Sequence, residues 1–234
     1  MSETDIDFSQ FEADAGVTFS DKDLLRQAFT HRSYINENND TQLHHNERLE
    51  FLGDAVLELV VTDFLYHKYP NKPEGELTSY RAALVNSETC SRVANSLSFN
   101  DYLLLSKGEA KDTGRARQYI LADTLEAVIG AMYLDQGYAA ARDFISTHLS
   151  PLIEEIVQKG TWVDAKSKFQ EEAQEHAAVT PTYEILEESG PDHDKHFEVG
   201  VYLEDEQVAT GTGNAKQEAE QEAARHALEE KGWS

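Results

Sequence analysis

The segment from Asn46 to Tyr69 constrains the fold more than any other part of the chain, because its apolar residues recur at the spacing of a helix. Pro70 follows directly and has no amide hydrogen with which to continue a helix. The segment therefore predicts one long, strongly apolar helix that ends before Pro70. Further helices are expected over residues 19–29, with Ser20 as the N-cap, over 76–97 as one or two helices, and over 120–135 and 139–158, with loops over 36–44 and 106–117.

Three acidic residues lie on the apolar side of this predicted helix. Glu47, Glu50 and Asp54 are spaced i, i+3 and i+7, and they share one face at 3.6 residues per turn. The same face continues through Leu57 and Val61, whereas a solvated face would continue with Lys, Glu or Gln. Acidic groups at the edge of an apolar surface are costly unless something pairs with them. We therefore expect a positive partner at this face.

A second acidic pair, Asp123 and Glu126, has i, i+3 spacing in the helix predicted over residues 120–135. Its face continues through Ala127 and Gly130, which are small enough to let another helix or a ligand approach. If the two helices cross, four carboxylates converge, and two of them about 5 Å apart repel by roughly 3 kcal/mol at an effective dielectric of about 20. Such a cluster must take up protons or a cation, and oxygen ligands favour Mg²⁺ or Mn²⁺. Acidic pairs at this spacing are also common on solvated helices, so the spacing alone leaves metal binding open and names no substrate.

The sequence pattern changes after about residue 160. Lys159, Gly160 and Thr161 resemble a short linker. Beyond it, apolar residues at every second position predict strands, and alanines at helical spacing predict a final helix. The expected order is α-β-β-β-α, with a polar helix over 164–178, strands over 182–188, 197–203 and 207–213, and a helix over 216–231. We therefore expect two domains, residues 1–159 and residues 160–234.

Composition limits the classes of function. The chain has 44 acidic and 20 basic residues, for a net charge of −24. Phosphate contacts need cations, so the charge by itself argues against a nucleic-acid partner. The single cysteine, Cys90, allows no internal disulfide, and the acidic start lacks the pattern of a secretory signal. No apolar run approaches the roughly 20 residues of a membrane span. These features fit a cytoplasmic protein without a membrane partner.

The twelve residues from Asn46 to Leu57, Asn-Glu-Arg-Leu-Glu-Phe-Leu-Gly-Asp-Ala-Val-Leu, resemble the signature of the ribonuclease III family. Further segments resemble other parts of that family's catalytic domain in the expected order, at residues 30–34, 73–77, 81–86 and 122–131. The resemblance implies an all-α endonuclease domain that hydrolyses phosphodiester bonds in double-stranded RNA and leaves 5′-phosphate and 3′-hydroxyl ends with short 3′ overhangs. It also implies a role in processing rRNA and mRNA precursors.

The resemblance assigns the family's metal ligands to four residues of this chain. They are Glu50, Asp54, Asp123 and Glu126, and all four carboxylates are intact. Asp54 and Glu126 are thereby also expected to be catalytic. Mg²⁺ is the expected ion, and Mn²⁺ is expected to substitute for it.

Three further residues receive roles from the same resemblance. Glu47 and Glu74 match acidic positions that the family places near the scissile strand or the dimer interface, and they are expected to assist catalysis. Phe51 matches the apolar residue that enters a pocket of the partner subunit. The family acts as a homodimer with one catalytic centre in each subunit, so the chain is expected to dimerise.

The tail resembles a small α+β double-stranded RNA-binding domain, which has the same α-β-β-β-α order. Residues 190–197 match that family's Gly-Pro-x-His loop, which enters a minor groove and contains His193 and Lys195 here. Gln170 and Glu171 match polar positions on its first helix. Such domains recognise the shape of an A-form duplex over about 16 base pairs. Double-stranded RNA is therefore the expected partner.

The tail departs from that family at the start of its last helix. Several lysines or arginines usually stand there, and only Lys216 remains in this chain. Residues 161–234 contain 18 acidic and 6 basic residues, a net charge of −12, and the first 160 residues also carry −12. Two explanations are open. Either the chain is adapted to a salty cytoplasm, where counterion release contributes little to RNA binding, or its tail binds RNA weakly. The chain-wide excess of acids favours the first explanation.

Two other functions stay open at this point. One is a duplex-RNA-binding protein that keeps the fold without catalysis, although four intact carboxylates count against it. The other is a metal-dependent nuclease for a different structured nucleic acid. Competition between duplex RNA and duplex DNA would separate that function from the expected one.

Overall fold

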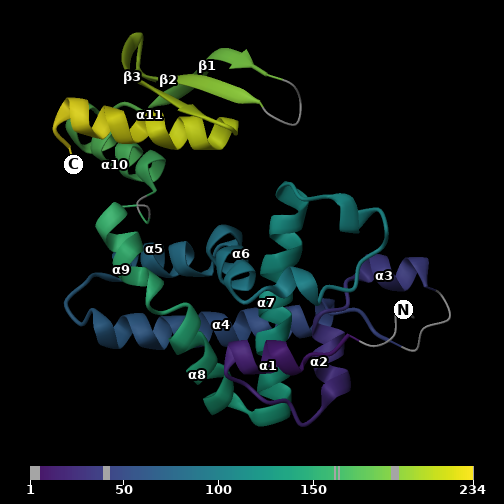
Figure 1. Ribbon diagram of the computed structural model, residues 1–234. Coiled ribbons are helices and arrows are strands. Elements are labelled where there is room, and N and C mark those ends of the chain that lie inside the picture. Colours follow the sequence, from purple (N-terminus) through teal and green to yellow (C-terminus); the bar gives the residue numbers. More distant parts are fainter. Residues whose placement is uncertain (1–5, 39–42, 161, 163, 191–194, 234) are drawn as a thin grey trace. The chain divides into compact units, whose positions relative to one another are not determined.

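The computed structural model describes residues 6–38, 43–160, 162, 164–190 and 195–233. It divides into two compact units, Met1–Trp162 and Val163–Ser234, and each is described by itself. The N-terminal unit is helical (Figure 1). Its described helices are α1 Ser9–Ala15, α2 Lys22–Ala28, α3 Arg32–Glu37, α4 Glu47–Lys68, α5 Glu74–Val85, α6 Ser87–Ser96, α7 Arg115–Gln136, α8 Tyr138–His148 and α9 Leu152–Lys159, with 3-10 turns at Phe99–Asp101 and Glu109–Lys111.

The two longest helices, α4 and α7, cross at the centre of the N-terminal unit (Figure 1). They cross at Gly53 and Gly130, where the two backbones touch. A Cβ atom on Gly53 would overlap the carbonyl oxygen of Glu126, and one on Gly130 would overlap the carbonyl oxygen of Leu49. The expectation that small residues on α7 admit another helix is thus confirmed at Gly130.

The apolar face of α4 lies in the core as predicted. Leu57 and Val61 are fully buried, and they pack in one cluster with Leu125 and Val128 of α7. The helix begins at Glu47 and ends at Lys68, within one residue of the predicted bounds at each end. The α4 stripe that begins with acidic residues therefore continues into the core.

The N-cap of α2 is Asp21, and the prediction of Ser20 was wrong. The Asp21 carboxylate accepts hydrogen bonds from the amides of Asp23 and Leu24, both at 3.0 Å. The amides of Ser20 and Asp21 instead donate to the carboxylate of Asp135 at the end of α7, each at 2.9 Å. The distant Asp135 thus positions Ser20 outside the helix and leaves the capping role to Asp21.

The single helix predicted over residues 139–158 is two helices. The first, α8, ends at His148, and α9 begins at Leu152. Pro151 stands between them and has no amide hydrogen to donate to the preceding turn. The helical hydrogen bonding is therefore interrupted at Pro151, and α9 begins immediately after it.

Other helix limits also differ from the predictions. Helices α1 and α3 lie outside the predicted helices, and the end of α3 falls in the loop predicted over 36–44, of which residues 39–42 lie outside the described residues. Helix α7 begins at Arg115, five residues before the predicted start, inside the loop predicted over 106–117. Its first five residues are exposed or half-buried, so apolar periodicity begins only at Ile120.

The C-terminal unit has the predicted α-β-β-β-α order. Its elements are α10 Ala165–Ala177, β1 Thr182–Ser189, β2 His196–Leu203, β3 Glu206–Gly213 and α11 Lys216–Lys231. The strands form an antiparallel sheet in the order β1-β2-β3, and both helices lie on one face of it (Figure 1). The alanine stripe of α11 is fully buried at Ala219, Ala223 and Ala227.

The two tryptophans, one just before the C-terminal unit in the sequence and one near its end, have packing roles. Trp162 packs edge-on against Tyr80 of the N-terminal unit, with ring centroids 4.6 Å apart. Trp233 packs against Phe169 in the core of the C-terminal unit, with ring centroids 5.6 Å apart. Among the described residues, no helix is both long and apolar enough to cross a membrane.

Candidate functional site

The α4–α7 crossing brings the two predicted acidic pairs together. On α4, Glu50 and Asp54 flank the contact residue Gly53. On α7, Glu126 provides the carbonyl oxygen that Gly53 touches, and Asp123 lies one turn earlier. The close approach of two glycines thus places side chains of both helices at the same rim of the core.

The closeness of these acids and their burial shift their pKa values. Burial raises the pKa of Glu50 to about 7, and the charge of Asp123 on the opposite helix adds to the rise. Burial raises the pKa of Glu126 to about 8, and the charges of Asp54 and Asp123 contribute smaller increases. Burial also raises the pKa of Asp123. The cluster therefore holds protons that ordinary carboxyl groups would release well below neutral pH.

The donor atoms of this cluster fit a hard divalent cation. All four predicted ligands present carboxylate oxygens, which are the ligands that Mg²⁺ and Mn²⁺ prefer. In the described parts of the chain, no three acidic, histidine or cysteine side chains stand in a ready-made ion-binding group. For a cation to bind here, the carboxylate oxygens must therefore come closer together than they lie in this structure.

The other two predicted catalytic acids differ in their relation to the cluster. Glu47 contributes to the raised pKa of Glu50, and its carboxylate also pairs with Arg32 at 3.2 Å. Glu74 is an exposed residue in the first turn of α5, where its carboxylate accepts a hydrogen bond from the Thr78 hydroxyl at 2.9 Å. The structure brings Glu47 to the cluster, whereas Glu74 is not among the charges that shift the pKa of Glu50 or Glu126.

Three residues near the cluster had not been singled out from the sequence for these roles. Glu58 adds to the charge acting on Glu126 and pairs with Arg81 at 2.8 Å. Glu58 stands four residues after Asp54, so helical spacing alone could have placed it on the same side of α4. Cys90 of α6 is fully buried, and burial followed by the charges of the cluster raises the pKa of its thiol. Gly53 sets the helix crossing, which no local pattern shows.

The predicted dimer contact is strongly exposed. The Phe51 side chain on α4 is 81% exposed, although it is large and apolar. Leu59 and Tyr66 of the same helix are also exposed, at 57% and 68%. Positions 51, 59 and 66 follow one another at near-helical spacing, so they form an apolar stripe on the side of α4 that faces away from the core.

The predicted RNA contacts of the C-terminal unit lie on its helices and strand ends. Gln170 and Glu171 are exposed on α10. Lys195, just before β2, pairs with Glu188 at 2.5 Å, and Lys216 at the start of α11 pairs with a glutamate at 3.6 Å. His193 lies outside the described residues.

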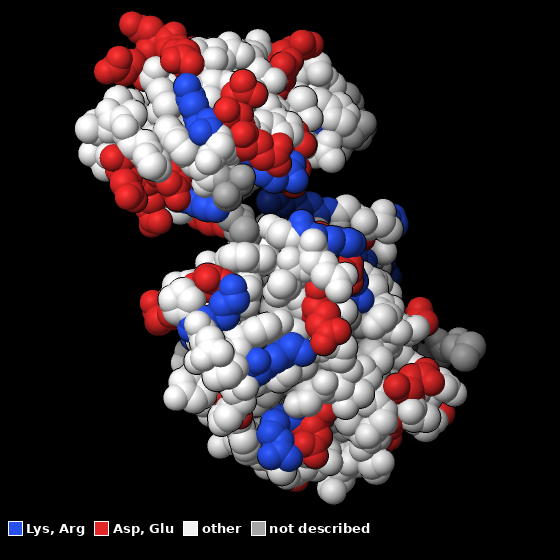
Figure 2. All heavy atoms as spheres, turned by 90° about the vertical axis from the view of Figure 1, so that its left-hand side faces the viewer, with Lys and Arg blue, Asp and Glu red and all other residues white. Residues whose placement is uncertain are grey.

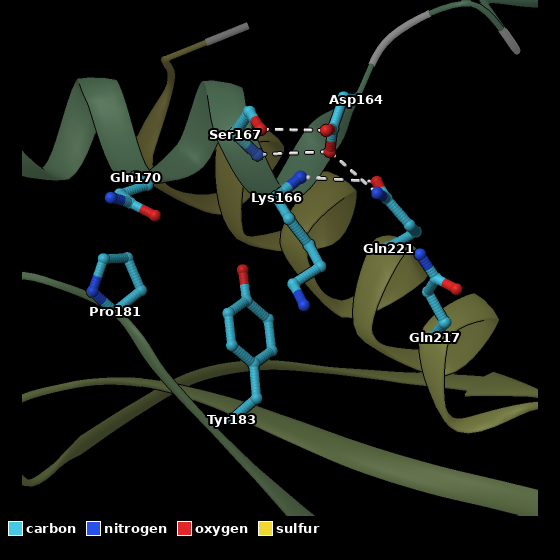
Figure 3. A pocket seen from close by; sticks show the side chains of 8 residues that line it. All are labelled: Asp164, Lys166, Ser167, Gln170, Pro181, Tyr183, Gln217 and Gln221. Atoms are coloured by element: carbon cyan, nitrogen blue, oxygen red, sulfur yellow. Dashed lines mark hydrogen bonds between the residues drawn. The ribbon is translucent and has the colours of Figure 1, made fainter.

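Gln170 also borders a polar pocket of about 220 Å³ in the C-terminal unit (Figure 3). The hydroxyl of Tyr183 points into the space between α10 and α11, and its buried oxygen has no hydrogen-bond partner among the residues that the structure describes. The lining residues are Asp164, Lys166, Ser167, Gln170, Pro181, Tyr183, Gln217 and Gln221.

Charge is distributed unevenly over the molecular surface. On the face drawn in Figure 2, acidic side chains gather on the C-terminal unit at the top of the view, and Lys and Arg side chains lie among them. The excess of acidic residues seen in the sequence is therefore displayed on the surface of the unit that carries the predicted RNA contacts.

Comparisons with known proteins assign both units to families. Residues 21–153 match the family described as ribonuclease-III-like, and residues 165–231 match the double-stranded RNA binding motif. Ribonuclease 3 of Streptococcus thermophilus is 45% identical over 226 residues, which cover 95% of this chain and 97% of the relative. Ribonuclease 3 of Protochlamydia amoebophila is 47% identical over 217 residues, which cover 93% of this chain and 89% of the relative.

A solved structure also resembles the N-terminal unit. It is the nuclease domain of ribonuclease III from Campylobacter jejuni, which is 40% identical and aligns with a TM-score of 0.57. The alignment covers 62% of this chain and 97% of that domain. That structure is described as showing flexibility in a region involved in dimer formation.

Proposed function

Because this chain belongs to the ribonuclease III family of metal-dependent nucleases, we propose that the carboxylates at the α4–α7 crossing hold its divalent ions. The chain is a double-strand-specific endoribonuclease that leaves 5′-phosphate and 3′-hydroxyl ends with short 3′ overhangs. The proposed ligands are Glu50, Asp54, Asp123 and Glu126. The observation that supports this assignment is the backbone contact of α4 and α7 at Gly53 and Gly130, which places acids of both helices at one rim of the core. The raised pKa values of Glu50 and Glu126, each shifted in part by charges on the opposite helix, agree with it.

The proposed ion is Mg²⁺, with Mn²⁺ able to replace it. An all-oxygen donor set favours both ions over Zn²⁺, for which nitrogen and sulfur ligands are usual. When bound, such an ion activates water and stabilises the charge that develops on the phosphate. Glu50 and Glu126 must lose their protons before they bind it. Glu47, beside Glu50, and Glu74 are proposed to act near the scissile strand or at the dimer interface.

We propose that residues 1–159 form the catalytic domain and that residues 160–234 bind duplex RNA. Exposed Gln170 and Glu171 support the second assignment, and Lys195, Lys216 and His193 complete the proposed contacts. Recognition of the A-form duplex by shape lets such a domain act on many transcripts. The proposed setting is the cytoplasm, where rRNA and mRNA precursors would be the substrates.

Substitution of one proposed ligand tests the metal site. Asp54→Asn keeps the size of the side chain but removes a charge, so we expect cleavage of a long duplex RNA in Mg²⁺ to fall by at least about 100-fold. The same change at Asp63, an exposed residue farther along α4, is the matched control and should leave the rate intact. Cleavage by the Asp54→Asn variant at the wild-type rate would refute the assignment.

We also propose that two copies of the chain associate through the exposed stripe of α4. Phe51 carries this proposal, because an apolar side chain that is 81% exposed favours a covering partner. Phe51→Ala should weaken the dimer by about 2 kcal/mol or more, measured as a rise in its dissociation constant by sedimentation. Ile185→Ala, which removes an exposed apolar residue of β1, serves as the control. Unchanged association of Phe51→Ala would remove Phe51 from the interface.

A further inference from the structure

The basic side chains of the C-terminal unit are largely paired with acids of the same unit. Five of its six lysines and arginines make such ion pairs. Two of the five, Lys195 and Lys216, are proposed RNA contacts. The pairs are Lys166–Glu220 at 2.5 Å, Lys195–Glu188 at 2.5 Å, Lys216–Glu220 at 3.6 Å, Arg225–Glu222 at 3.3 Å and Lys231–Glu206 at 3.0 Å.

Glu220 differs from the other acids because one carboxylate contacts two lysines. Its Oε2 atom contacts Nζ of Lys166 on α10, and its Oε1 atom contacts Nζ of Lys216 one turn earlier on α11. The side chain of Glu220 is only 12% exposed, whereas those of Lys166 and Lys216 are 33% and 55% exposed. The carboxylate is therefore the inner member of a three-residue network whose two cations remain open to solvent.

Lys166 also links this network to the polar pocket. Its ammonium group lies over the ring of Tyr183, 4.9 Å from the ring centroid. Figure 3 shows Lys166 and Tyr183 in the pocket that Gln170, a proposed RNA contact, also lines. Both lysines held by Glu220 thus belong to the surface that Gln170 and the start of α11 define.

We propose that Glu220 competes with RNA phosphate for Lys166 and Lys216. This competition lowers the affinity of the C-terminal unit for duplex RNA and weakens the dependence of that affinity on salt. The inference rests on the proposed function, in which this unit binds duplex RNA and Lys216 is a contact. A phosphate that approaches either lysine must displace the carboxylate of Glu220. The affinity gained from the new ion pair is offset by the ion pair that is lost.

The same exchange explains the expected salt dependence. A lysine that binds a phosphate releases a condensed cation from the RNA, and each such release makes the affinity fall more steeply with salt. When the lysine leaves a carboxylate to do so, that carboxylate attracts a cation from solution. Uptake at Glu220 balances release from the RNA, so the network adds little to the salt dependence of binding.

Glu220→Gln tests this proposal in the full-length chain, with a short duplex RNA and no divalent ion, so that binding is measured without cleavage. Glutamine keeps the size of the side chain and removes its charge. We expect the dissociation constant at about 50 mM salt to fall roughly 3- to 10-fold. The slope of log affinity against log salt should steepen by about one unit, measured up to about 200 mM salt.

A matched control exists at another ion pair of α11, in which Glu206 of β3 is the acidic partner. Glu206→Gln breaks the pair with Lys231, which stands at the opposite end of α11 from Lys216, fifteen residues away and thus about 22 Å along the helix. This variant should bind duplex RNA with the affinity and salt slope of the wild-type chain. An equal gain in both variants would mean that net charge alone governs affinity, and it would overturn the role of Glu220.

Lys216→Gln in both backgrounds separates the network from general charge effects. The substitution should weaken binding more in the Glu220→Gln chain than in the wild-type chain, because Glu220 no longer neutralises Lys216 there. Equal losses in the two backgrounds would show that Glu220 does not compete at Lys216, and they would overturn the proposal.

Folding and function are tested separately. Circular dichroism shows whether Glu220→Gln keeps the wild-type fold. If it does not, Glu188→Gln decides, because it removes the ion pair between Glu188 and Lys195, in which both side chains are more than one-third exposed. Tighter binding by that variant supports internal competition, and unchanged binding overturns it. Failure of all chains to bind duplex RNA would refute the proposed function itself, whereas equal binding by all chains would refute this inference alone.

Discussion

The two units carry the same net charge of −12 but place their acids in opposite environments. In the N-terminal unit, acids converge at a helix crossing, where burial raises the pKa of Glu50 and Glu126. In the C-terminal unit, Glu188, Glu206 and Glu220 pair with lysines, and a hydrogen bond from the backbone amide of Thr212 lowers the pKa of Glu222. Unpaired acids favour binding of a cation, whereas paired acids compete with the phosphates of RNA. The position of a carboxylate therefore decides its effect more than the total charge does.

The largest expected effect comes from the helix crossing that gathers the N-terminal acids. Gly53→Ala places a Cβ atom into the backbone of α7, so it should separate α4 from α7 and lower the free energy of unfolding by about 3 kcal/mol or more. RNA cleavage should be lost with it. Gly75→Ala, at a site of α5 where nothing lies within 4 Å of the new atom, is the control and should be neutral or slightly stabilising. Thermal melting measures both variants, and an unaffected Gly53→Ala chain would show that the helices do not need this contact.

A second prediction concerns the acids themselves. The pKa of Glu126 is about 8 in the folded chain and near 4.5 for an ordinary glutamate, so the folded state holds the extra proton between these values. Stability of the metal-free chain should therefore decrease as pH rises through this window. Glu126→Gln should reduce the decrease, should melt at a higher temperature than wild type above pH 8, and should lose cleavage.

Melting curves across pH, with and without Mg²⁺, check this prediction. Mg²⁺ should raise the melting temperature of the wild-type chain most at the alkaline end, because the deprotonated carboxylates bind it. Glu88→Gln, at an exposed position of α6, should behave as wild type. A Glu126→Gln chain with the same pH profile as wild type would contradict the environment described for Glu126.

An acid of the C-terminal unit should show the opposite sign and a smaller effect. Burial opposes ionisation of Asp164, but hydrogen bonds from Gln221 and Ser167 outweigh it and lower the pKa of Asp164. Its stabilising contribution is thus present above the pKa of an unfolded aspartate and is lost as pH falls through the lower folded value. Asp164 is also the N-cap of α10, so Asp164→Ala should destabilise this unit by about 1 kcal/mol at neutral pH.

Hydrogen exchange can assign this loss to one unit. Amides of α10 and α11 should exchange faster in Asp164→Ala, while those of α4 and α7 should not change. Glu229→Ala, at an exposed position near the end of α11, provides the comparison. Equal protection in the two variants would indicate that Asp164 contributes nothing to the stability of its unit.

Local patterns predicted most of the elements. Helix α11 has the predicted bounds, and α4 begins and ends within one residue of its predicted limits, because both have a clear repeat of apolar residues. Helix α7 begins earlier than predicted because its first turns are too exposed to show that repeat. The break between α8 and α9 could have been predicted from Pro151, because proline has no amide hydrogen with which to continue a helix.

The sequence by itself determined the order of elements in the C-terminal unit, the two families and the four candidate metal ligands, because periodicity and motifs are properties of neighbouring residues. Only the tertiary structure decided where α4 and α7 touch, and thus that Gly53 and Gly130 bring the acids of the two helices together. It also decided that Glu220 holds two lysines, one of them more than fifty residues away on α10. Such contacts join residues that are distant along the chain, and they follow from the packing of the whole core.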